Sequence, residues 1–89
     1  MEVGSHPIQV LSVCGADGKL QPLRFRFEDE AHQLHTVEIS EVVDMRRTAH
    51  VGIDALCYLC RAELDGMHHL FELRYAIRSH RWDLARKLY

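Results

Sequence analysis

Several features of membrane, secreted and catalytic proteins are missing from this sequence. None of its apolar runs approaches the ~18 residues that a membrane-spanning helix needs. The first residues lack the basic start and apolar core of a signal peptide. The 3 cysteines are an odd number and too sparse for the disulfide framework of a small secreted protein. We therefore expect one cytoplasmic domain spanning residues 1–89, with residues 1–5 flexible and no membrane contact.

Catalytic and metal-binding motifs are also missing. There is no G-x-S-x-G, no glycine-rich phosphate loop and no H-E-x-x-H. Cys57 and Cys60 have C-x-x-C spacing, but no second such pair follows, and an offset of three on a strand points the two thiols to opposite faces. His68 and His69, two of the 7 histidines, are adjacent, so on a strand their side chains also point to opposite faces. We expect no enzymatic activity, no cofactor and no metal.

The net charge of −2 conceals an uneven distribution along the chain. Residues 1–45 carry 3 Lys/Arg against 8 Asp/Glu, whereas residues 46–89 carry 8 against 5. This polarity could guide self-association or attract an anionic partner. The alternative is an ordinary solvated surface of mixed sign, because no basic run exceeds two residues.

The stretch from Asp54 to Arg78 has the pattern of a β-hairpin. Asp65-Gly66 is the dipeptide of a tight type I′ turn, in which both central residues need a positive φ. This turn pairs Cys60 with Phe71. It also places apolar residues on one face of the hairpin and mostly polar ones on the other. The apolar face holds Leu56, Tyr58, Cys60, Leu64, Met67, Phe71, Leu73 and Tyr75.

A second Asp-Gly pair, Asp17-Gly18, predicts a hairpin between residues 7–14 and 20–28. A two-residue loop there pairs Val10 with Phe25 and Ser12 with Leu23. Pro22 would interrupt a central ladder, so the tip of this hairpin is expected to be an edge or a bulge.

The remaining segments are less regular. Residues 33–40 form a third strand with Val37 and Ile39 inward, and residues 40–50 form a connection, for which a short helix near 41–48 is an alternative. Residues 81–89 fit either a strand with Trp82 and Leu84 inward or a helix beginning at Ser79. We favour the strand because it would cover an exposed sheet edge.

Together these segments predict an all-β fold, a six-stranded antiparallel meander that forms a small closed or partly open barrel. Its core should hold Phe25, Phe27, Phe71, Leu73, Tyr75 and Trp82, while Arg24, Arg26, Glu72 and Arg74 should be exposed.

Three stretches resemble a group of short bacterial proteins without an assigned activity. They are residues 22–29 (PLRFRFED), 70–75 (LFELRY) and 80–82 (HRW). The resemblance implies a small all-β cytoplasmic protein, and it brings no functional residues with it.

Two functions remain open at this stage. The first is a non-enzymatic module that acts by protein association, as a homodimer or an accessory subunit, with Leu11, Leu59 and Leu70 exposed on otherwise polar faces. The second is a small barrel that binds single-stranded nucleic acid. In either case the candidate binding residues are the outward arginines, because guanidinium groups fit phosphates and carboxylates. These are Arg24, Arg26, Arg61, Arg74 and Arg78.

Overall fold

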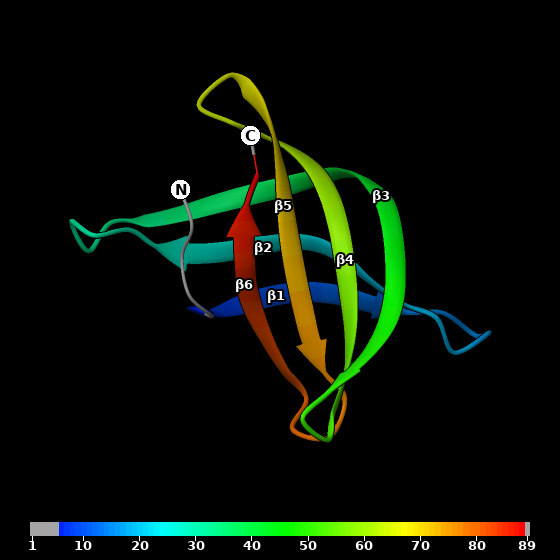
Figure 1. The fold of residues 1–89 in the computed structure, drawn as a ribbon. Helices are drawn as coiled ribbons and strands as arrows, with labels where there is room; N and C mark the ends of the chain where they lie inside the picture. Colours follow the sequence, from blue (N-terminus) through cyan, green and yellow to red (C-terminus); the bar gives the residue numbers. More distant parts are fainter. Residues whose placement is uncertain (1–5, 89) are drawn as a thin grey trace.

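Six antiparallel strands in meander order close into a barrel in the computed structural model, which describes residues 6–88 (Figure 1). The strands are β1 (His6–Cys14), β2 (Leu20–Glu28), β3 (Leu34–His50), β4 (Ile53–Leu64), β5 (Met67–Ala76) and β6 (Arg81–Lys87). This confirms the all-β, six-stranded prediction and shows that the sheet closes. The flexibility expected of residues 1–5 lies outside the described part of the chain.

The barrel has the form of two crossed layers joined by β3. In Figure 1, β1 and β2 run across the direction of β4, β5 and β6. β3 pairs with β2 over residues 34–38 and with β4 over residues 38–50. Within the second stretch Ser40 and Val43 have no ladder partner on β4, so each is an extra residue in a β-bulge. Bulges bend a strand, and two of them allow β3 to turn from one layer to the other.

The segment 40–50 is therefore strand, and its interpretation as a connection was wrong. The short helix considered near 41–48 is absent, and residues 6–88 contain no helix. The two bulges break the alternation of apolar and polar residues, which is the signal that identifies a strand in a sequence.

The β4–β5 hairpin has the predicted register. Its pairs run from Leu64↔Met67 at the turn to Ala55↔Ala76 at the far end. Asp65 and Gly66 have φ values of 53° and 76°, as a type I′ turn requires.

The β1–β2 hairpin follows the predicted register only away from its turn. Val10 lies opposite Phe25 as expected, but Ser12 lies opposite Pro22 instead of Leu23. Leu23 is thus an extra residue, which confirms the bulge expected beside Pro22. The shift arises because the loop is longer than two residues: the Gly15 amide donates to the Lys19 carbonyl at 2.9 Å.

The core contains most of the predicted residues. Phe25, Phe71, Leu73 and Trp82 are buried, together with Val37, Tyr58, Cys60, Ala62 and Leu84. Phe25 and Phe71 meet edge to face, with ring centroids 5.2 Å apart, a favoured geometry for aromatic pairs. Phe27 and Tyr75 are half-buried, because they lie near the two ends of the barrel.

Of the four residues predicted to be exposed, two are exposed and two are half-buried. Arg24 and Arg26 are exposed as expected, whereas Glu72 and Arg74 are half-buried. Glu72 is shielded by Arg86, whose Nε and Nη2 donate to Glu72 Oε1 at 2.9 and 2.7 Å.

β6 confirms the strand interpretation of the last segment and closes the barrel. Trp82 and Leu84 face inward, and β6 pairs with β1 only through His6↔Leu84, Pro7↔Asp83 and Ile8↔Trp82. This short closure leaves the rest of β1 without a partner on that side. The described residues form no helix that could cross a membrane.

Candidate functional site

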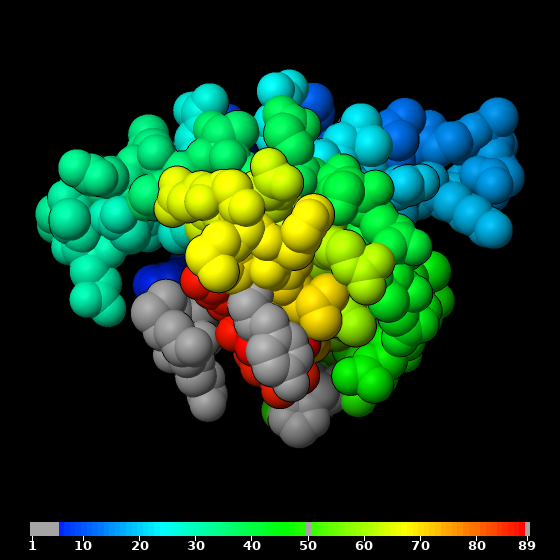
Figure 2. All heavy atoms as spheres, turned by 90° about the horizontal axis from the view of Figure 1, so that it is seen from above, coloured from blue at the N-terminus to red at the C-terminus, as the bar shows by residue number. Residues whose placement is uncertain are grey.

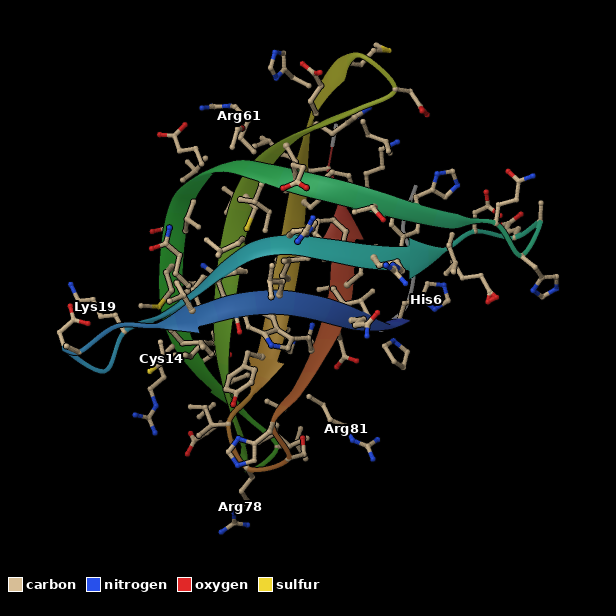
Figure 3. All side chains as sticks on the ribbon, turned by 180° about the vertical axis from the view of Figure 1, so that it is seen from behind. His6, Cys14, Lys19, Arg61, Arg78 and Arg81 are labelled. Atoms are coloured by element: carbon tan, nitrogen blue, oxygen red, sulfur yellow. The ribbon has the colours of Figure 1, made fainter. Side chains whose placement is uncertain are left out.

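The five candidate arginines do not form one site. Arg24 and Arg26 lie together on the outer face of β2, where Arg24 pairs with Glu38 at 3.2 Å. Arg61 pairs with Glu41 on neighbouring β3, at the opposite end of the molecule from Arg78 (Figure 3). Arg74 is half-buried on the outer face of β5. The structure therefore brings together only Arg24 and Arg26.

The three leucines expected to be exposed also lie on separate surfaces. Leu11 is on the outer face of β1, with 51% of its surface exposed. Leu59 and Leu70 are half-buried on the outer face of the other layer. Leu11 has different apolar neighbours: Val13 two residues along β1 and the bulged Leu23 on β2, which are 48% and 41% exposed.

The most distinctive feature of the layer formed by β1 and β2 is the free edge of β1, the side of this strand that faces away from β2. From Gln9 to Cys14, β1 pairs with β2 on one side, and no residue of this stretch has a ladder partner on its other side among the described segments. Figure 1 shows this end of the β1–β2 hairpin extending beyond β3 and β4. In an antiparallel strand every second residue turns its N–H and C=O to the same side, so this edge presents unpaired donors and acceptors.

The composition of this edge favours pairing with another strand. Residues 7–16 contain no Asp, Glu, Lys, Arg or His. They include Ile8, Val10 and Val13, which are β-branched residues suited to strands. Charged residues, prolines inside the strand and bulges are the usual means of preventing edge-to-edge association. Between Gln9 and Cys14, β1 has no charged residue, no proline and no extra residue of its own, because the bulge of this ladder lies at Leu23 on β2.

Another free edge of the described barrel, on β3, provides a comparison within the same chain. Beyond residue 39, β3 pairs with β4 only. This edge carries both bulges of β3 and four charged residues, Glu41, Asp44, Arg46 and Arg47. The chain thus protects this edge of β3 and leaves the edge of β1 unprotected. The uncharged run was visible in the sequence, but the closure of the barrel decides which edge stays unpaired.

The cysteines are free thiols with separate environments. Cys57 and Cys60 are both buried, and they lie on opposite faces of β4 as predicted. Burial raises the pKa of the Cys60 thiol to about 12, so this group is uncharged and unreactive at neutral pH. Cys14 is exposed at the end of β1. In residues 6–88, no three His, Cys, Asp or Glu side chains come together in a way that could hold a metal ion.

The β2–β3 turn is organised by Asp29. Its Oδ1 accepts the Ala31 and Gln33 amides at 2.8 and 2.9 Å, and its Oδ2 accepts a hydrogen bond from His35 Nε2 at 2.6 Å. The bond from His35, followed by that from the Gln33 amide, holds the pKa of the Asp29 carboxyl below its ordinary value. The His35 ring also stacks on Phe27 at 5.0 Å. This turn forms one side of the barrel mouth, a region that the sequence did not single out.

Comparison with protein-family models, curated proteins and solved structures found no match to this chain. The functional argument therefore depends on the geometry alone.

Proposed function

We propose that this protein is a non-enzymatic β module that acts through protein association, and that its first partner is a second copy of the same chain. The free, uncharged edge of β1 carries the proposal. Two such edges pair antiparallel about a two-fold axis. This pairing joins the layer that contains β1 and β2 in one barrel to the same layer in the other, as one continuous sheet.

The sequence of β1 is compatible with pairing to itself. With the axis at Ser12, Leu11 of one copy lies opposite Val13 of the other, and the reverse pair follows by symmetry. Both side chains are about half exposed in the single chain, so the contact buries apolar surface beside the new hydrogen bonds. Like charges cannot meet across this axis, because residues 7–16 carry none.

The outer face of β2 and β3, next to β1, carries charges that are compatible with contact to the same face of a second copy. Arg24 and Arg26 share the outer face of this layer with Glu28 and Glu38. A face that carries both signs can be complementary to its own copy, whereas a face of one sign repels it. The uneven charge along the chain is consistent with this role. The three free thiols agree with the cytoplasmic location that forms part of this proposal.

The alternative partner, single-stranded nucleic acid, stays a prediction. Such proteins stack bases on exposed aromatic rings beside basic residues. Here Phe25, Tyr58 and Trp82 are buried in the core, so none of them flanks the Arg24–Arg26 pair. No specific observation favours nucleic-acid binding over protein association.

Sedimentation equilibrium over a wide range of concentrations tests the proposal. The parent should show an average mass that rises from 10.4 kDa towards twice that value. Leu11→Lys should remain a monomer, because a lysine on an edge strand opposes pairing. The control is Leu34→Lys, the same substitution at a residue that is 64% exposed on β3, and it should associate like the parent.

The contradicting results are equally definite. A parent that stays monomeric at the highest concentration removes self-association as the function. Equal loss of association in Leu11→Lys and Leu34→Lys places the contact elsewhere on the surface.

A further inference from the structure

A cavity at the barrel mouth, where β1 begins and β6 ends, has the size of a small-molecule site. Its volume is about 740 Å3, within the range of about 300–1,000 Å3 that such sites occupy. Its larger apolar lining residues are Pro7, Phe27, Leu64, Phe71 and Leu84. Figure 2 views the molecule from above, with the β2–β3 turn (blue-green) to one side of the β4–β5 turn (yellow).

Aromatic rings form a continuous series from the core to this cavity. The ring centroids of Phe71 and Phe25 are 5.2 Å apart, and those of Phe25 and Phe27 are 6.2 Å apart. The His35 ring stacks on Phe27 at 5.0 Å and donates a hydrogen bond to Asp29 at 2.6 Å. Phe27, Phe71 and His35 all line the cavity. This wall is therefore preformed, and a further aromatic ring can pack against it.

The charged groups of the lining are of both signs. They are three carboxylates and one ammonium group, on Glu28, Asp29, Glu30 and Lys87. Two of the carboxylates have a histidine partner, because Glu28 Oε2 lies 3.4 Å from His32 Nδ1 and Asp29 is bonded as described. Lys87 lies opposite Phe71 in the β5–β6 ladder, so it shares the inward face of that ring. An anion in the cavity would meet the carboxylates, and a cation would meet Lys87.

From this arrangement we propose a second site, independent of the association surface, that binds an uncharged small molecule with a flat aromatic body. The ring of this molecule packs against Phe27 and Leu64, and the apolar surface that leaves water stabilises the complex. An ionised molecule of the same shape buries the same surface. It also loses part of the hydration of its charge, beside at least one group that repels it.

Fluorescence titration with N-phenyl-1-naphthylamine, which is uncharged at neutral pH, tests the site. The parent should bind one probe per chain in a saturable manner. Three competitors then vary the charge on one naphthalene ring system: 1-naphthalenemethanol is neutral, 1-naphthoate is an anion and 1-naphthylmethylammonium is a cation. The alcohol should displace the probe at a roughly tenfold lower concentration than either ion, because it gives up no hydration of a charge.

A substitution in the lining tests the location of the site. Leu64→Gln places an amide against the bound ring and should weaken probe binding by roughly tenfold. The matched control is Leu34→Gln, the same change at a residue that is 64% exposed and outside the lining, and it should bind like the parent. Near-ultraviolet circular dichroism verifies that both variants keep their native packing.

Amide chemical shifts of the parent locate the probe without a substitution. The probe should shift the amides of Phe27 and Leu84, which line the cavity, and leave that of Tyr75, near the other end of β5, unchanged. Four results overturn the proposal: no saturable site, an ion that displaces the probe as well as the alcohol does, equal weakening by the two leucine variants, or shifts centred on Tyr75. Leu11→Lys does not alter the lining, so a failure here is distinct from a failure of association.

Discussion

Val51 adopts the left-handed backbone conformation, which is unfavourable for a β-branched residue. Val51 and Gly52 form the two-residue turn between β3 and β4, with φ values of 52° and 75°. For an ordinary L-residue the left-handed region costs roughly 1–2 kcal/mol, and β-branched residues are especially rare there. Asn tolerates this region and is favoured in type I′ turns. The Val51 side chain is 83% exposed, so its replacement removes little packing.

Val51→Asn should therefore stabilise the fold by about 1 kcal/mol, the lower end of the cost of the left-handed conformation. For a domain of this size the melting temperature should rise by about 4–8 °C. Urea denaturation should show a higher midpoint with an unchanged slope. Ile53→Asn is the control, since it removes an apolar residue that is 59% exposed but has no positive φ. Equal or lower stability of Val51→Asn would refute the argument from backbone strain.

Three further predictions concern the core and the titratable groups. Phe71→Ala should cost about 3–5 kcal/mol of unfolding free energy, whereas Arg26→Ala should change it by less than about 0.5 kcal/mol, by chemical denaturation. At neutral pH a thiol reagent should modify Cys14 at once and Cys60 only after unfolding, because burial raises the pKa of Cys60 to about 12. The lowered pKa of Asp29 stabilises the fold above its ordinary value of 3.8, and this contribution is lost as the pH falls through the folded-state pKa. Asp29→Asn should thus be less stable than the parent at neutral pH, with the difference closing in acid.

The sequence predicted the fold where local turn chemistry determines strand pairing. Asp65-Gly66 requires two positive φ values, and this requirement alone sets the β4–β5 register. The same reasoning was incomplete at Asp17-Gly18. There only Gly18 has a positive φ, and the longer loop displaces the pairing near the turn. A dipeptide indicates a turn more reliably than it indicates the length of the loop.

The long β3 strand, the free edge of β1 and the barrel mouth depend on the closed barrel. Ser40 and Val43 interrupt the alternation of β3, so its second half resembled a connection. His6, His35 and Lys87 are far apart in sequence and share the mouth only because β1 and β3 begin there and β6 ends there. Four of the five candidate arginines lie on outer strand faces as expected, whereas Arg78 lies in the turn after β5. The sequence could not show that the crossed layers separate them.

Residue-resolved amide hydrogen exchange at low and high protein concentration tests the proposed association most directly. Pairing of β1 with its copy predicts that amides between Gln9 and Cys14 become more protected as concentration rises. The amides on the free edge of β3, between Glu41 and Thr48, should exchange at the same rate at both concentrations. Protection that appears on β3, or β1 exchange that does not depend on concentration, would contradict the proposed association.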